Sequence, residues 1–272
     1  MNMKRKIQFM LLRLQMRRRH RRRSRGYEID MCNGPLFGKI LIFAVPLMLS
    51  GMLQLFFNAA DIIVVGQFVG HTALAAVGST GSLINLLVNV FVGLSVGTNV
   101  LVARYYGARD AKHLHETVHT SVLTSVLSGT ALIVIGLILA EPLLTLMGTP
   151  DDVLDQAALY MRIYFVGMPA SMLYNFGAAI LRAVGDTKRP LYFLFISGIV
   201  NVILNLVLVL VFRLGVAGVA VATVTSQVIS AVLVALCLIK TDAPYRLELK
   251  KLRIHKSKLL EIIKIGLPAG MQ

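Results

Sequence analysis

Charged residues are scarce in this sequence: they make up 15% of its 272 residues, whereas hydrophobic residues make up 56%. A soluble domain carries roughly 25% charged residues, because these side chains must cover its surface. The scarcity therefore excludes an ordinary water-soluble globular fold. Cysteine is rare as well, with only Cys32 and Cys237 present, so no disulfide framework is expected.

Acidic residues are absent from residues 1–25, which hold eleven of the 28 lysines and arginines. The formal net charge of +15 therefore comes mostly from this arm, and no nucleic-acid partner is expected for the chain. We expect residues 1–30 to form a basic, disordered cytoplasmic arm near anionic lipid headgroups, with a nucleic-acid or headgroup ligand of the arm as the alternative. A signal peptide is not expected, because Arg13 interrupts the apolar stretch 7–16.

Long apolar stretches fill most of the remaining chain. A helix needs about 20 apolar residues to cross ~30 Å of hydrocarbon. The pattern predicts an all-α polytopic membrane protein, with a six-helix transmembrane bundle in residues 31–240. A β-barrel is not expected, because the apolar runs are continuous rather than alternating. The expected spans are 40–69, 77–103, 117–140, 158–182, 191–212 and 215–239.

Loop charges predict the orientation of this bundle, since lysine and arginine gather on the cytoplasmic side of a membrane. With the N-terminus inside, all but two of the 28 basic residues fall on that side, the exceptions being Arg162 and Arg213. The outer loop expected at 141–157 is acidic. We therefore expect a plasma-membrane protein with a cytoplasmic N-terminus.

The last residues of the sequence resemble the start of the first span. Aligning Pro268 with Pro46 places apolar residues opposite apolar residues on the N-terminal side. Internal repeats of this kind are typical of secondary transporters. Residues 241–272 are therefore expected to form a cytoplasmic linker and the truncated start of a second lobe, with the beginning of a seventh helix.

Asp61 is the one acidic residue deep inside an expected span. An ionisable side chain is costly there, so it generally faces the bundle interior and has a function. Gln54 and Asn58 precede it at helical spacing, which places all three side chains on one helix face.

Further polar side chains occur in the fifth and sixth spans. Asn201 and Asn205 are four residues apart and share a helix face, and Thr223 lies in the sixth span. At ~1.5 Å per residue, Asn205, Thr223 and Asp61 should all lie roughly 12 Å below the outer surface. Such oxygens can coordinate Na⁺ or hold a proton on the carboxylate. The alternative is that the asparagines and the threonine only form hydrogen bonds between helices.

Three stretches resemble the multidrug and toxic compound extrusion (MATE) family of efflux transporters. They are, in order along the chain, PLMLSGMLQLFFNAADIIVVGQFVG, GLSVGTNVLVARYYGARD and LRAVGDTKRP. The resemblance covers residues 30–272 and implies a twelve-helix fold of two lobes, of which this chain holds the N-terminal one. It also implies export of organic cations and drugs in exchange for Na⁺ or H⁺, commonly across a bacterial inner membrane, with no cofactor and no enzymatic activity.

The resemblance carries roles to single residues. Asp61 matches the first-helix carboxylate of the family, and Pro46 matches the proline at which that helix can bend. Asn201 and Thr223 match ligand positions of the fifth and sixth helices. Asn205 stands where some members have Asp and others Asn, so one carboxylate remains and the choice between Na⁺ and H⁺ stays open.

Cavity-lining roles are expected for three further residues, Gln54, Asn58 and Asn175. The second lobe that would close the cavity is missing after Gln272. The chain is therefore either a fragment that is inactive alone, half of a two-chain transporter or a lobe that forms a homodimer. Export of a lipid-linked precursor by a related fold is the less favoured alternative.

Two stretches match enzyme motifs, but a structural role explains each of them better than catalysis does. Residues 115–119 fit the zinc-protease pattern H-E-x-x-H, but a catalytic zinc site needs a third protein ligand, and no obvious one follows. Residues 93–97 fit G-x-S-x-G, which requires a strand–turn–helix elbow. Because they lie inside an apolar helix, helix packing is the expected use of these glycines.

Overall fold

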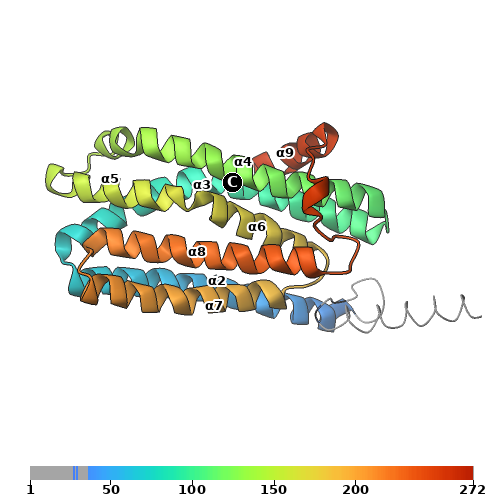
Figure 1. Ribbon diagram of the computed structural model, residues 1–272, viewed down its shortest axis with the longest axis horizontal. Coiled ribbons are helices and arrows are strands. Elements are labelled where there is room, and N and C mark those ends of the chain that lie inside the picture. The colour runs from blue at the N-terminus through green and yellow to red at the C-terminus, as the bar shows by residue number, and fades with distance from the viewer. Residues whose placement is uncertain (1–26, 28, 30–35, 272) are drawn as a thin grey trace, which may run out of the picture.

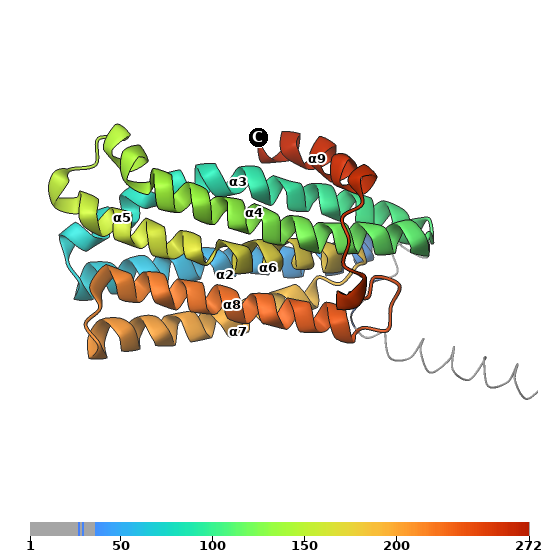
Figure 2. The same ribbon diagram turned by 45° about the horizontal axis from the view of Figure 1, so that its top comes forward.

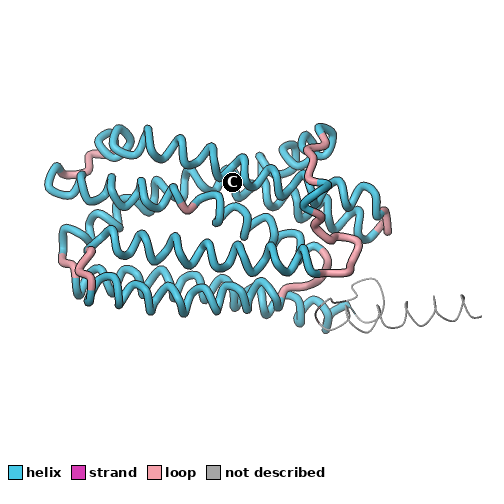
Figure 3. Tube along the Cα trace, in the orientation of Figure 1, coloured by secondary structure: helices cyan, strands magenta, loops and turns pink. Residues whose placement is uncertain are grey.

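The structure is a computed structural model that describes residues 27, 29 and 36–271. Cys32 and all of the expected arm except Tyr27 and Ile29 lie outside the described residues. The described residues form helices joined by loops, with no strand among them (Figure 3). The helices are α2 (Leu36–Phe68), α3 (His71–Gly107), α4 (Ala111–Leu146), α5 (Asp151–Val166), α6 (Met168–Ala183), α7 (Lys188–Leu206), the π-helix η1 (Val207–Val211), α8 (Gly215–Lys240), the 3₁₀-helix η2 (Leu249–Lys251) and α9 (Lys256–Gly270).

The long helices run side by side, with the loops gathered at the two ends of the bundle (Figure 1). Helix α6 lies against α3, α4 and α8, while α7 packs between α2 and α8. Helix α9 packs mainly on α3, on the face of the bundle away from α7 (Figure 2). The all-α membrane bundle expected from the sequence is confirmed.

Six spans result if one bent helix pair is taken as a single span. Helices α2, α3, α4, α8 and the continuous pair α7–η1 are each long and apolar enough to cross a membrane. Helices α5 and α6 satisfy the same criteria only together, and they are bent by 49° relative to each other. The described helices therefore give five spans, or six if the bent pair α5–α6 is one broken span.

The single helix expected at 158–182 is wrong in this respect, because the chain breaks at Gly167. Pro169 has no N–H to donate to the carbonyl of Phe165, so one helical hydrogen bond is lost there. A Cβ at Gly167 would lie 2.7 Å from Gln227 Oε1 and 2.8 Å from Val224 Cγ2. The break thus also lets the chain approach α8 closely.

The loop expected at 141–157 is mostly helical. Helix α4 continues to Leu146 and α5 begins at Asp151, so only residues 147–150 connect them. Acidic residues occupy the first turn of α5, where the helix dipole favours negative charge. Glu141 accepts a 2.8 Å hydrogen bond from Arg162 Nη2, which joins the two helices near this end.

Glycines bring α9 against α3. A Cβ at Gly93 would overlap the backbone of Gly270, and one at Gly97 would overlap the carbonyl of Ile262. In return, a Cβ at Gly266 would lie 2.6 Å from Leu94 Cα. Each helix thus presents two glycines four residues apart, the small-residue spacing that lets membrane helices approach closely. Packing, as expected, is the use of the glycines in residues 93–97.

Candidate cation site

The structure brings Asp61, Asn201, Asn205 and Thr223 together from three helices. Asn205 Nδ2 donates a hydrogen bond to Asp61 Oδ1 and lies 3.4 Å from Asn201 Oδ1. Thr223 Oγ1 lies 3.4 Å from Asp61 Oδ2 but only 3.0 Å from the carbonyl of Val219. Since the hydroxyl has one proton, its stronger bond goes to its own helix, and Asn205 is the main donor to the carboxylate.

These polar groups are shielded from solvent. Asp61 is 9% exposed, Asn201 4% and Asn205 0%. A carboxylate in such a place is costly unless it is protonated, hydrogen-bonded or paired with a cation. Asn205 Oδ1 is buried and has no hydrogen-bond partner within the part of the chain that the structure describes. The site therefore contains a free amide oxygen beside a carboxylate that is only partly satisfied.

Close approach of α2 to α7 depends on Gly198. A Cβ at this residue would overlap the ring of Phe57, so only glycine leaves room for that ring. Phe57 lies one turn before Asp61 on α2, and Gly198 lies one turn before Asn201 on α7. The packing of a ring on a glycine thus sets the distance between the carboxylate and the amides. Sequence reasoning did not identify this pair, because no spacing along the chain links the two residues.

The backbone changes geometry directly after Asn205. The α-helix ends at Leu206 and continues as the π-helix η1. Single π-helical turns inside α-helices occur frequently at functional sites, because they reorient the adjoining side chains. This irregularity was not predicted from the continuous apolar run.

Two tyrosines of α5 belong to the surroundings of the carboxylate and were also missed. Tyr160 and Tyr164 stack with ring centroids 6.0 Å apart. Both are close enough to Asp61 to interact with it electrostatically. Their spacing of four residues on one helix face is a signal that the sequence does contain.

The remaining expected residues lie apart from this cluster. Gln54 and Asn58 are exposed on α2, and within the described residues neither forms a hydrogen bond with Asp61. Asn175 is half-buried on α6 and donates a 2.9 Å hydrogen bond to the carbonyl of Ser171 in the same helix. Their cavity-lining roles stay predictions.

Helix α2 continues without interruption through Pro46, which is buried. The carbonyl of Pro46 accepts a 2.8 Å hydrogen bond from Ser50 Oγ. Because proline cannot donate to the preceding turn, the helix has one hydrogen bond fewer at this point. A bend here stays a prediction.

His119 of the H-E-x-x-H stretch has a structural role. Its Nδ1 donates to the carbonyl of His115 at 2.8 Å, so in the neutral ring Nε2 accepts from the backbone N–H of Glu248 at 3.1 Å. The ring also stacks on that of His115, with centroids 3.9 Å apart. With both ring nitrogens engaged, His119 has no lone pair left for zinc.

Comparison with known proteins gives a consistent result. The sequence profile of the MatE family matches residues 46–207, a range that includes Asp61, Asn201 and Asn205. "Probable multidrug resistance protein YoeA" of Bacillus subtilis is 35% identical over 237 residues, which cover 85% of this chain and 51% of that protein. "Probable multidrug resistance protein YpnP" of the same bacterium is 30% identical over 244 residues, covering 89% and 54%.

A solved structure, described as the outward-facing conformation of a multidrug resistance MATE family transporter of the MOP superfamily, has the same fold. It matches with a TM-score of 0.80 at 28% identity, over 86% of this chain and 52% of that one. The chain thus spans about half the length of the curated relatives it matches. Because the family profile covers more than half of its residues and the bundle is shared with a solved transporter of that family, this chain belongs to the MatE family of multi-pass membrane transporters.

Proposed function

We propose that this chain is the N-terminal lobe of an antiporter that exports organic cations and drugs in exchange for Na⁺ or H⁺. The observation that carries the proposal is the buried contact of the Asp61 carboxylate with the Asn205 amide. Burial makes the free energy of the charged carboxylate sensitive to any cation that neutralises it. The names of the multidrug resistance relatives support the substrate class.

The Asn205 side chain acts as the switch between an empty and an occupied site. With its NH₂ group toward Asp61, the amide satisfies the bare carboxylate. Rotation of the amide by half a turn replaces this donor with the oxygen Oδ1, which otherwise lacks a partner. Oxygens from Asp61, Asn201 and Asn205 then face one point, an arrangement that is favourable only around a cation or a proton.

Coupling follows from the different affinity of two conformations for the ion. A ligand shifts such an equilibrium only if it binds the two states unequally. Cation binding at Asp61 neutralises the buried charge and favours close packing of α2, α7 and α8. Cation release restores the charge and favours a looser state in which a cationic substrate is held. Pro46 and the break at Gly167 supply the points at which helices bend.

The cavity is completed by a second lobe or by a second copy of this chain. Gln54 and Asn58 are polar and exposed on the apolar helix α2, where lipid contact alone would be unfavourable. They line the cavity together with Asn175. The basic loops lie on the cytoplasmic side of a bacterial inner membrane, with the N-terminus inside.

The test measures ion binding first, because binding does not require the second lobe. Purified chain is titrated with radioactive ²²Na⁺ and, separately, assayed for proton release, using the parent and Asp61→Asn. The exposed Asp152→Asn at the start of α5 is the matched control. Loss of both signals in Asp61→Asn alone supports the proposal, whereas unchanged binding would overturn it.

Transport is tested in proteoliposomes that contain the complete two-lobe assembly. An imposed Na⁺ or pH gradient should drive efflux of ethidium, a fluorescent organic cation, in the parent and in Asp152→Asn. Asp61→Asn should insert normally yet show no gradient-driven efflux. Undiminished efflux by this variant would contradict the assigned role of the carboxylate.

A further inference from the structure

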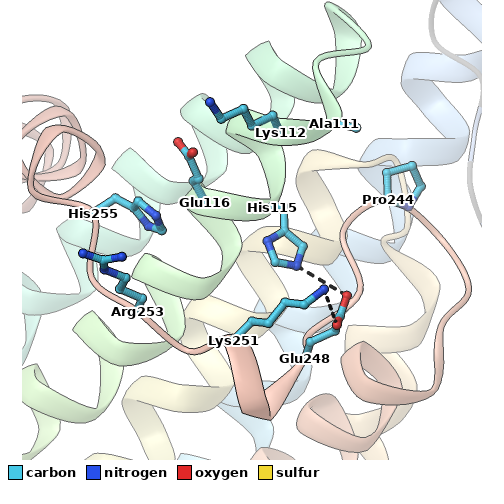
Figure 4. Close-up of a pocket in the computed structure, with 9 residues that line it drawn as sticks. All are labelled: Ala111, Lys112, His115, Glu116, Pro244, Glu248, Lys251, Arg253 and His255. Atoms are coloured by element: carbon cyan, nitrogen blue, oxygen red, sulfur yellow. Dashed lines mark ion pairs between the residues drawn. The ribbon is translucent and has the colours of Figure 1, made fainter.

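A pocket of about 590 Å³ lies at one end of the bundle, beside the first turns of α4 (Figure 4). Its other walls are the chain between α8 and α9, which includes η2. The lining residues are Ala111, Lys112, His115, Glu116, Pro244, Glu248, Lys251, Arg253 and His255. The pocket shares no residue with the Asp61 site.

Basic groups outnumber carboxylates in this pocket. Lys112, Lys251 and Arg253 carry permanent positive charge, against the two glutamates. Lys112 and Arg253 are exposed, and neither forms an ion pair with a carboxylate in the described part of the chain. Two cations from separate segments are therefore available to a ligand.

One of the two carboxylates is already engaged. Lys251 Nζ lies 2.8 Å from Glu248 Oε2, and this hydrogen bond is the main reason that the pKa of Glu248 is lowered. His115 Nε2 lies 3.6 Å from Glu248 Oε1, too far for a hydrogen bond but close enough for an ion pair when His115 is protonated (Figure 4). The negative charge of Glu248 therefore offsets the positive charge of Lys251. It does not offset the charges of Lys112 and Arg253.

One imidazole nitrogen at the pocket lacks a partner within the described part of the chain. His255 Nδ1 is buried, and no hydrogen bond reaches it from any described residue. His115 Nε2 is also buried without a hydrogen bond, but it can form an ion pair with Glu248 Oε1 at 3.6 Å when the ring is protonated. His255 is held in place by its backbone N–H, which donates to Thr120 Oγ1 at 3.1 Å. An unmade hydrogen bond of a buried group is costly, so the ring of His255 is placed for a partner that supplies an acceptor oxygen.

We propose that this pocket binds a phosphate group, carried by an anionic phospholipid headgroup or by a soluble phosphate compound. Arg253 supplies the planar fork that suits phosphate oxygens, and Lys112 supplies a point charge. The imidazole N–H of His255 completes the set of donors. The pocket lies beside the start of α4 and the chain that follows α8, two helices long and apolar enough to cross a membrane, and we therefore place it near the lipid phosphates.

Glu116 makes it possible to test whether the ligand of this pocket is an anion or a cation. Its carboxylate lines the pocket from α4 and forms no ion pair among the described residues. A phosphate site should bind its ligand more tightly when this charge is removed and more weakly when Lys112 or Arg253 is neutralised. A cation site would respond in the opposite direction to each change.

The experiment uses the purified full chain in detergent and two probes. One is dioleoyl phosphatidic acid, compared with dioleoyl phosphatidylcholine; the other is inorganic pyrophosphate. Binding is followed by native mass spectrometry and by the rise of the thermal midpoint with probe concentration. The variants are Lys112→Gln/Arg253→Gln and Glu116→Gln. Arg246→Gln/Lys250→Gln is the matched control, since it removes the same charge from exposed residues outside the pocket.

We expect the Lys112→Gln/Arg253→Gln pair to raise the dissociation constant about tenfold or more, and Glu116→Gln to lower it several-fold. The matched control should bind like the parent. Binding of phosphatidic acid alone identifies a lipid headgroup as the ligand, while binding of pyrophosphate as well identifies a general phosphate site. Equal weakening by the control pair, or binding of neither probe by the parent, would overturn the proposal. No readout depends on ion exchange at Asp61.

Discussion

Asn205 on α7 donates its side-chain amide to the carboxylate of Asp61 on α2, although the two residues are 144 positions apart in the chain. The contact lies inside the bundle, because Asn205 is fully buried and Asp61 nearly so. A hydrogen bond to a charged group contributes about 1.5–3 kcal/mol, and loss of one partner leaves the other unsatisfied. This one contact therefore affects both the packing of α2 on α7 and the charge state of the site.

We predict that Asn205→Leu lowers the free energy of unfolding by about 2 kcal/mol or more, because a buried carboxylate loses its main donor. The double variant Asp61→Asn/Asn205→Leu should recover much of this loss. A double-mutant cycle, measured by unfolding in mixed SDS micelles, should give a coupling of about 1–3 kcal/mol. Additive effects of the two changes would show that the contact is energetically unimportant.

Asn205→Asp should make the site bind cations more tightly. It places a second carboxylate beside Asp61, and the repulsion between two neighbouring negative charges is relieved by a cation or a proton between them. We expect Na⁺ to raise the thermal midpoint of this variant more than that of the parent, with K⁺ as the control ion. The same Na⁺ response in both proteins would contradict a cation site at this position.

Much of the candidate site could be predicted from the sequence. Helix length is proportional to residue number, so counting from the ends of the spans placed Asp61, Asn205 and Thr223 at one depth, and the structure brings them together. Counting could not show how strongly each interacts. The hydroxyl of Thr223 donates its hydrogen bond mainly to the carbonyl of Val219, a preference set by the local helix backbone.

Other features of the fold and the site depend on tertiary contacts, which the spacing of residues along the sequence does not predict. Helical spacing places Gln54 and Asn58 on the same broad face as Asp61, but the structure buries Asp61 and leaves the other two side chains exposed. At the break, Gly167 leaves room for side chains of α8, and this contact is tertiary. For the same reason, the role of Gly198 became visible only in the structure.

Gly198→Ala should separate α2 from α7 and disturb the cation site. The added Cβ overlaps the ring of Phe57, and overpacking of this kind typically costs about 1–3 kcal/mol. We expect a lower thermal midpoint and weaker ²²Na⁺ binding, both partly restored by Phe57→Leu. Gly51→Ala on α2 is the matched control, since its Cβ would meet nothing within 4 Å. Equal behaviour of the two alanine variants would rule out this packing as the determinant.

Gly97→Ala should release α9 from α3. The new Cβ overlaps the carbonyl of Ile262 and lies 3.0 Å from the backbone nitrogen of Gly266, and backbone atoms cannot rotate away as a side chain can. The loop between α8 and α9 contains the exposed Arg246, so trypsin can report on the docking of α9. We expect cleavage there to be several-fold faster, because local opening becomes less costly.

Gly78→Ala on the same helix as Gly97 is the matched control, because its Cβ would have open space around it. Helix propensity predicts that this control is stabilised slightly, by about 0.5–1 kcal/mol. Gly266→Ala should reproduce the effect of Gly97→Ala from the opposite helix, since its Cβ would lie 2.6 Å from Leu94 Cα. Equal resistance of all three variants to trypsin would show that the glycines are dispensable for the docking of α9. Polar contacts near Lys258, whose Nζ donates to Tyr105 Oη at 2.6 Å, would then hold the helix.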